Sequence, residues 1–580
     1  MLVIENCDYY RKYKKICVSS DGHSLLYISN ADGLNQIYSF NLSVQKTTKI
    51  TSQPQHVKDY WKSDSSGIHL FFTCDDCGNE REQLYALKKD GSVEEMIYEP
   101  ESYHYISSSS MNNQIYYVSN KHQSNRFILK SLDINTKDIT TLYITDEVIT
   151  SLTSLSKDRL LLTIEKTNID KILKIYNIAS GEITTLHNSY GRISCLNVLS
   201  GSQVLFVGDQ GGENTKIVQL NINTGDVVDI ASLPNADIIS YCLYKGTQTL
   251  VMETIQKGYS QLYKADMSRS TALEKLDHSQ VVFQSMCFIG NDKLAAIASS
   301  PIMPPHIITL GIRLKTNSTQ VDNHFISNIF DGYGYYQSFD GRGIEYSYIS
   351  DDNKNKKAVI YLHGGPEHRA KREFSSLIAN IADAGHSVFL PNIRGSSGYG
   401  RSFLAMDSGK QREAALKDII YLRQHLVENL GFSEKHVSIM GHSYGGFMTL
   451  LSISHYPNLW ASAIDIVGMS HISNFLRSTP KWRRPLREYK YGRLENLSQY
   501  FNNQAPLHRA ENITCPLLIL HGTHDARVPY QESENMYKKM AHNNPSPNFY
   551  QITNEGHFFL HRDTLKKISE ISINFLTSHG

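Results

Sequence analysis

The sequence predicts a protein of two halves: a seven-bladed β-propeller over residues 1–318, followed by a doubly wound, mostly parallel α/β sheet over residues 319–580. Three observations predict this fold class. The chain has 580 residues, which is too many for a single core. One apolar strand pattern recurs seven times in the first half. After about residue 320, strand-like and helix-like segments alternate instead.

The first half repeats with a period of about 45 residues. Each unit holds a turn rich in Ser, Asp, Asn and Gly, an apolar strand, a polar gap and a second strand. A lone four-stranded blade cannot bury both faces of its sheet, so radial stacking of the units has to supply the core. A β-sandwich array with accidental spacing is the alternative. The third residues of the seven apolar strands, which recur in steps of 43 to 46, are Tyr27, Phe71, Tyr116, Leu162, Leu205, Val251 and Ala296.

The second half alternates between the two kinds of element. Its longest helix is predicted over 411–430, where apolar residues recur along one side. Sheets of this kind keep their ligand sites at the carboxyl ends of the strands, so loops at those ends are the places to search. Strands are predicted at 333–339, 343–350, 357–365, 386–395, 436–443, 461–468, 516–522 and 548–553, and further helices at 374–384, from Gly446, at 530–542 and from Asp563.

Composition argues against several classes of partner. The formal net charge at pH 7 is +1, so nothing directs the chain to nucleic acid or to anionic membranes. The first 20 residues have no uninterrupted apolar segment and no small-residue cleavage site, so no signal peptide is expected. No apolar run is long enough to cross a bilayer. Eight cysteines are scattered over the whole length, which fits reduced thiols in a cytoplasmic protein.

Cysteine spacing gives no metal site. Cys74 and Cys77 form the only CxxC pair, and a zinc site of that type needs a second pair, which is not near in sequence. We therefore expect neither a metal nor another cofactor.

The segment "GHSYGGF", from Gly441 to Phe447, places a serine among glycines between a predicted strand and a predicted helix. It matches G-x-S-x-G, in which a tight turn exposes the serine hydroxyl at the top of the sheet. Side chains two positions before and after Ser443 would clash, which explains Gly441 and Gly445. Small-residue turns between strand and helix are common, so this motif alone leaves the role of Ser443 open.

Two later residues fit the partners that such a serine needs. Asp525 follows the predicted strand at 516–522, and His557 follows the predicted strand at 548–553, so both belong to the same edge of the sheet as Ser443. The chain order Ser, Asp, His is that of α/β-hydrolase domains. His557 would take the proton of Ser443, and Asp525 would fix the tautomer of His557. Taken singly, Asp525 is also explained as a helix cap, and His557 as one of 24 ordinary histidines.

The oxyanion hole of such a site needs two backbone donors. One is the N–H of the residue after the nucleophile, Tyr444. The other is assigned to the Gly365 N–H in "YLHGGP", where a strand ends. A plain Gly-Pro turn is the alternative for Gly365. A second glycine-rich run, 392–403, does not match G-x-G-x-x-G and is interpreted as a loop near the mouth of the site.

These motifs together resemble the prolyl oligopeptidase family of serine peptidases, and most closely its acylaminoacyl peptidase branch. The resemblance is carried by "HGGP", "NIRGSSGYGRSF", "GHSYGGFMT", "IDIVGMS", "HGTHDARVP" and "NEGH", in the order of the family. It implies an α/β-hydrolase domain capped by the propeller, so that only short, unfolded peptides reach the serine. It also implies a triad of Ser443, Asp525 and His557, with Gly365 and Tyr444 as oxyanion donors.

The resemblance further suggests residues that contact substrate. Arg527 matches a family position near the substrate, with a solvated loop arginine as the alternative. The segment 470–493 corresponds to the specificity region, where Phe475 and Trp482 are candidates for an apolar wall of the S1 pocket; core packing explains each equally well. Four arginines of this segment either hold a substrate carboxylate or form a solvated basic face: Arg477, Arg483, Arg484 and Arg487.

The function that follows is a cytoplasmic serine peptidase that hydrolyses short peptides, N-acylated ones among them, with no nucleic-acid or membrane partner. An esterase on the same scaffold is one alternative, and a dipeptidyl peptidase is another. The paired-glutamate motif of dipeptidyl peptidases has no clear match; "NEREQ" at 79–83 offers only an unpaired arrangement. A scaffold with an inactive hydrolase half is a third alternative, which the complete triad disfavours. The sequence leaves a homo-oligomer open.

Overall fold

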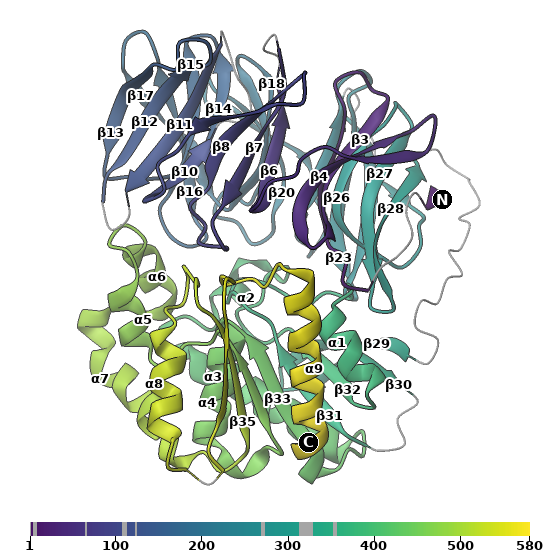
Figure 1. The fold of residues 1–580 in the computed structure, drawn as a ribbon, viewed down its shortest axis with the longest axis vertical. Coiled ribbons are helices and arrows are strands. Elements are labelled where there is room, and N and C mark those ends of the chain that lie inside the picture. Colours follow the sequence, from purple (N-terminus) through teal and green to yellow (C-terminus); the bar gives the residue numbers. More distant parts are fainter. Residues whose placement is uncertain are drawn as a thin grey trace.

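The computed structural model describes residues 2–3, 9–63, 67–106, 113–121, 125–267, 273–312, 329–351, 356–543 and 545–580. The propeller and the C-terminal half lie one above the other, with the propeller at the top of Figure 1. The predicted boundary between residues 318 and 319 lies outside the described residues. None of the helices in these ranges has the length and apolar character needed to cross a bilayer.

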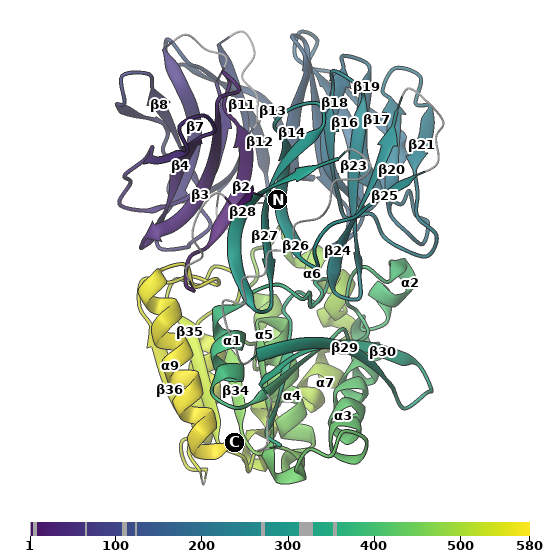
Figure 2. The ribbon, with the colours of Figure 1, turned by 90° about the vertical axis from the view of Figure 1, so that its right-hand side faces the viewer.

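The N-terminal half is a ring of seven four-stranded antiparallel sheets within the described residues (Figures 1 and 2). The seven residues that mark the sequence repeat all lie, buried, on the second strand of a blade, which confirms the predicted propeller. The blades stack through these apolar strands, as the lack of a closed core in a single blade requires.

The propeller strands are β1 (Leu2–Val3), β2 (Tyr13–Val18), β3 (Ser24–Asp32), β4 (Leu34–Asn41), β5 (Lys46–Lys49), β6 (His56–Lys62), β7 (Ile68–Asp75), β8 (Gln83–Lys88), β9 (Val93–Ile97), β10 (Ser102–Ile106), β11 (Gln114–Lys121), β12 (Phe127–Asp133), β13 (Ile139–Thr145), β14 (Val148–Ser156), β15 (Arg159–Glu165), β16 (Lys171–Asn177), β17 (Ile183–Gly191), β18 (Ile193–Ser200), β19 (Gln203–Gly208), β20 (Lys216–Asn221), β21 (Val227–Ala231), β22 (Ser240–Tyr244), β23 (Thr249–Gln256), β24 (Tyr259–Asp266), β25 (Glu274–Leu276), β26 (Val282–Phe288), β27 (Lys293–Ser300) and β28 (Met303–Gly311).

The last blade is completed from the other end of the repeat. Strands β26, β27 and β28 make three strands of its sheet, and β1 supplies the fourth by pairing antiparallel with β28. The N-terminal strand therefore closes the ring between the last blade and the first.

The C-terminal half is built on one eight-stranded sheet in the order β29-β30-β32-β31-β33-β34-β35-β36. Pairing is antiparallel from β29 to β32 and parallel from there on, which confirms the predicted mostly parallel sheet. The carboxyl ends of the parallel strands face the propeller (Figure 1). The strands are β29 (Ile329–Gln337), β30 (Gly343–Asp351), β31 (Ala358–Leu362), β32 (Ser387–Pro391), β33 (Val437–His442), β34 (Ala463–Ile466), β35 (Leu517–Gly522) and β36 (Asn548–Ile552).

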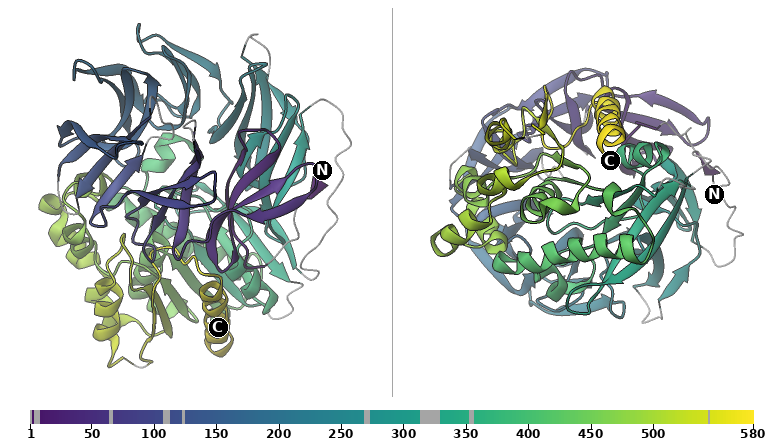
Figure 3. Two further views of the ribbon diagram at one scale, coloured as in Figure 1. Left: turned by 45° about the horizontal axis from the view of Figure 1, so that its top comes forward. Right: turned by 90° about the horizontal axis from the view of Figure 1, so that it is seen from below.

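Helices cover both faces of this sheet and bury its apolar side chains in two layers. One layer packs against α3, α4 and α8, and the other against α1 and α9. Figure 3 shows these helices over the ring of blades when the molecule is seen from below. The helices are α1 (Ser376–Asp383), α2 (Gly400–Ala405), α3 (Arg412–Glu428), α4 (Tyr444–His455), α5 (Ile472–Ser478), α6 (Arg484–Tyr491), α7 (Leu494–Gln504), α8 (Gln531–Met540) and α9 (Arg562–His579), with short 3₁₀ turns η1 (Gly409–Gln411), η2 (Glu434–His436), η3 (Pro457–Leu459) and η4 (Pro506–Asn512).

Candidate active site

Ser443 occupies a strained turn between β33 and α4. Its backbone has φ +58° and ψ −116°, a conformation that few non-glycine residues adopt. A Cβ on Gly441 would collide with the carbonyl of Gly445, and a Cβ on Gly445 would collide with the Leu362 carbonyl. The two glycines flanking the serine are therefore required by close backbone contacts, as the motif predicts.

The third glycine of the segment has a different neighbour. A Cβ on Gly446 would meet the carboxylate of Asp465, which lies on β34 beneath the turn. The first turn of α4 therefore sits directly on a buried acid.

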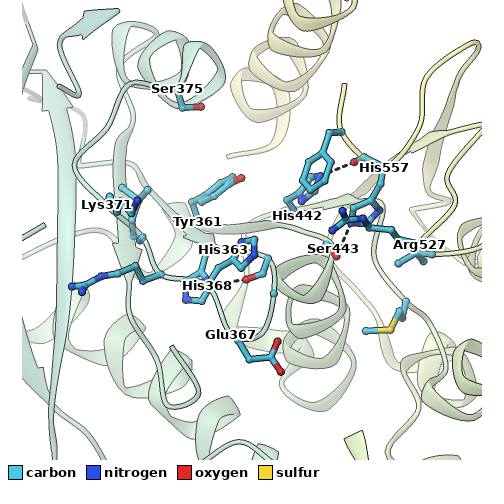
Figure 4. A pocket seen from close by; sticks show the side chains of 18 of the residues that line it. Tyr361, His363, Glu367, His368, Lys371, Ser375, His442, Ser443, Arg527 and His557 are labelled. Atoms are coloured by element: carbon cyan, nitrogen blue, oxygen red, sulfur yellow. Dashed lines mark hydrogen bonds between the residues drawn. The ribbon is translucent and has the colours of Figure 1, made fainter. Parts of the chain in front are cut away.

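Ser443, His557 and Asp525 form a continuous hydrogen-bonded chain, of which Figure 4 labels Ser443 and His557. The Asp525 carboxylate accepts from His557 Nδ1 at 2.7 Å, which leaves His557 Nε2 to accept from the Ser443 hydroxyl at 2.9 Å. His557 is 3% exposed, and the side chain of Asp525 is fully buried. The structure therefore brings the three predicted residues together at one edge of the sheet.

Asp525 is held as a carboxylate. Its Oδ1 accepts the backbone N–H groups of Arg527 and Val528 at 2.8 and 2.9 Å. Its Oδ2 lies 3.4 Å from Nε2 of the buried His521. Burial works against the charge, but the two neighbouring histidines outweigh burial and hold the pKa of Asp525 well below its usual range. An ionised Asp525 can stabilise a protonated His557.

Two histidines that were not predicted support this chain. His521, at the end of β35, donates from Nε2 to the Val528 carbonyl at 3.1 Å and therefore carries its proton on the nitrogen nearest Asp525. His442, the residue before Ser443, donates from Nε2 to the backbone carbonyl of His557 at 3.0 Å, and burial lowers the pKa of His442 to about 3. In the sequence both read as ordinary histidines within buried strands.

The loop that carries Gly365 lies against Ser443. A Cβ on Gly364 would lie 3.4 Å from the Ser443 Cβ and 3.2 Å from the His442 carbonyl. Gly365 itself has φ +128° and precedes a cis proline, Pro366. Tyr444 is the first residue of α4, directly after Ser443. Both predicted oxyanion donors thus belong to segments that adjoin the serine hydroxyl.

A cavity of about 340 Å³ opens above Ser443 (Figure 4). Its lining includes apolar side chains, among them Met469, Phe475, Tyr491 and Val528. The rest carries more positive than negative side chains: Arg369, Lys371, Arg487 and Arg527 against Glu367 and Glu373. Among the described residues, no group of His, Cys, Asp and Glu is arranged to hold a metal ion.

The predicted substrate residues separate into two groups. Phe475 and Arg527 line the cavity, and so does Arg487. Trp482 does not line it. Its ring lies 5.5 Å from that of Phe127 and 6.0 Å from that of Tyr103, both in the propeller. The interpretation of Trp482 as an S1 wall is therefore corrected to the packing alternative, because its ring is inserted between the halves.

The propeller reaches the histidine of the triad through one hairpin turn. The turn between β7 and β8 places Gly78 so close to Gly556 that a Cβ on Gly556 would collide with the Gly78 carbonyl. In the same turn, Glu80 has φ +60° and pairs with Arg527 at 2.5 Å. Blade β6–β9 therefore covers the loop that carries His557.

Comparisons with known proteins agree with this architecture. Residues 372–579 match the prolyl oligopeptidase family, and residues 4–164 match the N-terminal region of dipeptidyl peptidase IV. Dipeptidyl aminopeptidase BIII of Pseudoxanthomonas mexicana is 30% identical over 238 residues, 39% of this chain and 34% of that protein. The acylamino-acid-releasing enzyme of Homo sapiens is 22% identical over 327 residues, 52% of this chain and 45% of that protein. The chain thus matches less than half of the length of either relative.

Solved structures show the same fold over the whole chain. A puromycin-hydrolyzing peptidase of Mycobacterium tuberculosis superposes with a TM-score of 0.84 at 14% identity, covering 99% of this chain and 95% of that one. The acylaminoacyl peptidase of Pyrococcus horikoshii gives 0.74 at 14% identity, covering 99% and 97%. The C-terminal half therefore holds a domain of the prolyl oligopeptidase family, residues 372–579, and this domain carries the hydrogen-bonded serine, histidine and aspartate.

Proposed function

We propose that this protein hydrolyses short peptides, N-acylated ones among them, through an acyl-enzyme on Ser443. The observation that carries this proposal is the hydrogen-bonded chain from the Ser443 hydroxyl through His557 to the buried Asp525, at the floor of a cavity. A serine hydroxyl is a weak nucleophile until an adjacent base takes its proton, and this arrangement supplies the base.

The reaction follows from the protonation states. The Ser443 Oγ attacks the scissile carbonyl carbon while its proton passes to His557 Nε2, and Asp525 stabilises the resulting imidazolium. The N–H groups of Gly365 and Tyr444 would bind the oxyanion of the tetrahedral intermediate. His557 then gives its proton to the leaving amine as the C–N bond breaks, and the acyl group remains bound to Ser443 as an ester. Water, activated by His557, hydrolyses that ester and restores the hydroxyl.

Restriction to short peptides is supported by the contact between the propeller and the active-site loops. The β7–β8 turn lies on the His557 loop and pairs with Arg527 at the cavity wall. Such a cover disfavours the approach of a folded protein to Ser443, whereas a short extended peptide of a few residues fits a cavity of about 340 Å³.

A blocked amino terminus is supported by the charges around the cavity. Four basic side chains line it against two carboxylates, which disfavours a free ammonium group. Dipeptidyl release is the second candidate, because Glu80 brings a propeller carboxylate to Arg527 at the cavity. That carboxylate is already paired, so an amine would have to compete with Arg527 for it.

Labelling and substrate choice test the proposal. A fluorophosphonate probe is expected to label the wild-type protein at Ser443, and Ser443→Ala is expected to lose both labelling and all measurable turnover while its melting temperature is kept. Acetyl-aminoacyl, free-amine dipeptidyl and short-acyl ester substrates are compared by kcat/KM. Turnover by purified Ser443→Ala contradicts the nucleophile, and a preference for the dipeptidyl or ester substrate replaces the acylated-peptide proposal with the corresponding alternative.

Short peptides are the only binding partners that we propose, and we propose a cytoplasmic location. The location is supported by the seven cysteines among the described residues, all of which are free thiols. Sedimentation of the purified chain measures whether it forms a homo-oligomer.

A further inference from the structure

The side chain of Tyr444 points away from the cavity into a closed polar site. Its residue is 2% exposed, and its hydroxyl donates to Asp407 Oδ2 at 2.9 Å. Arg412 Nε donates to the same hydroxyl at 3.3 Å. Burial, followed by the charge of Asp407, raises the pKa of Tyr444 well above its usual range, so the phenol stays a proton donor.

Asp407 joins this tyrosine to α6 and α2. It is fully buried, and its Oδ1 lies 2.5 Å from Lys490 Nζ on α6. Lys490 also donates to the Leu404 carbonyl of α2 at 2.5 Å. A Cβ on Gly395 would collide with the Asp407 carboxylate, so the backbone encloses this carboxylate closely. The Asp407 side chain therefore has one oxygen for Tyr444 and one for Lys490.

The propeller holds the start of α2. The Arg401 guanidinium pairs with Asp170 at 2.7 Å and with Asp209 at 2.9 Å. The Arg401 N–H donates to the Glu213 carbonyl at 2.9 Å, and the Ser402 hydroxyl donates to the Glu213 carboxylate at 2.7 Å. Figure 2 shows α2 at the top of the C-terminal half, directly beneath the propeller.

We propose that Asp407 is a positioning residue that fixes the Tyr444 N–H of the oxyanion hole, and that the propeller supports Asp407 through α2. The inference rests on the proposed function, since it needs Tyr444 as an oxyanion donor. The N–H and the phenol belong to one residue, so an anchor on the phenol limits rotation of the peptide plane that carries the N–H. Such donors work only when they are preorganised, and a displacement of about 1 Å costs on the order of 100-fold in rate.

Tyr444→Phe is the sharpest test, because it removes the hydroxyl and leaves the Asp407–Lys490 pair and the backbone N–H in place. We expect kcat to fall about 10-fold or more with KM little changed, as for an interaction made only in the transition state. Affinity for a peptide aldehyde, which forms a tetrahedral adduct, is expected to fall in parallel, while the melting temperature changes little.

Asp407→Asn is expected to lower kcat in the same way, and the double variant Asp407→Asn/Tyr444→Phe to lose no more than either single variant. Asp407→Asn leaves the Lys490 ammonium buried without its charged partner. We therefore also measure the double variant Asp407→Asn/Lys490→Met, in which both charges are removed. Additive losses in kcat contradict the link between Asp407 and Tyr444.

Glu213→Ala tests the contribution of the propeller, because Glu213 is exposed and touches α2 only from outside. We expect kcat to fall about threefold to tenfold in the wild-type background and no further fall in the Tyr444→Phe background. Tyr259→Phe is the matched control: it removes another hydrogen bond between the halves, from Tyr259 to Asp331, which involves no residue of α2, and is expected to leave kcat unchanged.

The outcomes separate this inference from the proposed function. A wild-type protein that neither labels with fluorophosphonate nor turns over any substrate contradicts the function itself. An active wild type whose kcat is unaffected by Tyr444→Phe contradicts the inference alone. If Tyr444→Phe lowers kcat but Glu213→Ala has no effect on it, the claim that the propeller supports Asp407 through α2 is contradicted.

Discussion

Asp465 is a buried carboxylate beneath the turn that carries Ser443. It is fully buried, its Oδ1 accepts from the Gly468 N–H at 3.0 Å, and its Oδ2 has no hydrogen-bond partner among the described residues. Burial raises its pKa to about 7, with His521 opposing the shift. Ionisation of this residue above neutral pH therefore costs free energy in the folded state.

Replacing this acid by its neutral isostere should stabilise the protein at high pH. The pKa of Asp465 is near 7 when folded and near its ordinary acidic value when unfolded, so between these values the folded state binds more protons. The contribution of Asp465 to the free energy of unfolding of the wild type therefore falls as pH rises from about 4 to about 7. Asp465→Asn keeps the acceptor for Gly468 and lacks this pH dependence. Its free energy of unfolding should exceed that of the wild type more at pH 8 than at pH 5.

Urea unfolding of both proteins at pH 5 and pH 8 measures this difference. Asp138→Asn, in an exposed turn of the propeller, is the control and should give the same small difference at both values. A difference for Asp465→Asn that does not grow with pH contradicts a carboxyl that titrates near neutrality.

The hydrogen-bonded set of Ser443, Asp525 and His557 could be predicted residue by residue, whereas the buried residues around it could not. Ser443 lies in a motif whose glycines are required because a larger side chain would clash there. Asp525 and His557 follow strands whose carboxyl ends meet at one edge of the sheet. His521, Asp465 and Asp407 carry no such signal, because their importance comes from burial and from partners that only the folded chain brings near.

At the scale of elements, α6 and the turn before it join the two halves. Trp482 and Leu486 pack into the apolar cluster of blades β10–β13 and β14–β17, with Phe127 and Tyr103 around the indole. Phe475, on α5, instead lines the cavity and packs against Tyr491 at 5.5 Å. Of the two aromatic residues, Trp482 thus packs against the propeller, whereas Phe475 lines the cavity.

Substitution of these two residues should separate stability from specificity. Trp482→Ala removes a large buried side chain and is expected to lower the free energy of unfolding by about 3–5 kcal/mol, with the preference for the P1 residue unchanged. Phe475→Ala removes an apolar side chain from the cavity lining. It therefore enlarges the cavity and is expected to change the preference for the P1 residue. Denaturation curves and profiling with peptide mixtures measure both. A changed P1 profile in Trp482→Ala would restore its interpretation as an S1 residue.

The repeat predicted the second and third strands of each blade but not the closure of the ring. The period depends on apolar strands about 45 residues apart, and these strands lie buried in the blade cores. Strand β1 is two residues long and pairs with β28, which is more than 300 residues away in the sequence. The 45-residue repeat therefore gives no signal for this strand. Helices α2, α5, α6 and α7 were not predicted either, because they are short and pack on surfaces that other elements supply.

At the scale of the whole molecule, the two halves meet where the chemistry is proposed to occur. Sequence patterns identified each half from its own periodicity, but no pattern within one half specifies a contact with the other. The contact is nevertheless tight: the Gly78 backbone lies against Gly556, next to His557, and Glu80 pairs with Arg527. The position of the propeller and the position of the loop that carries His557 are therefore linked by backbone contact.

Gly556→Ala should break this link without straining its own backbone, since Gly556 does not adopt a positive φ. The added methyl group would collide with the Gly78 carbonyl, so either the propeller turn or the His557 loop has to move. A shift of about 1 Å in His557 relative to Ser443 is expected to lower kcat/KM by about 10-fold to 100-fold, and fluorophosphonate labelling by a similar factor. Gly343→Ala is the matched control, because its Cβ points into open space. The labelling rate and kcat/KM of both variants are measured beside their melting temperatures. If Gly556→Ala labels as fast as Gly343→Ala, the propeller turn does not set the position of His557. The cover over the active site then acts only by excluding large substrates.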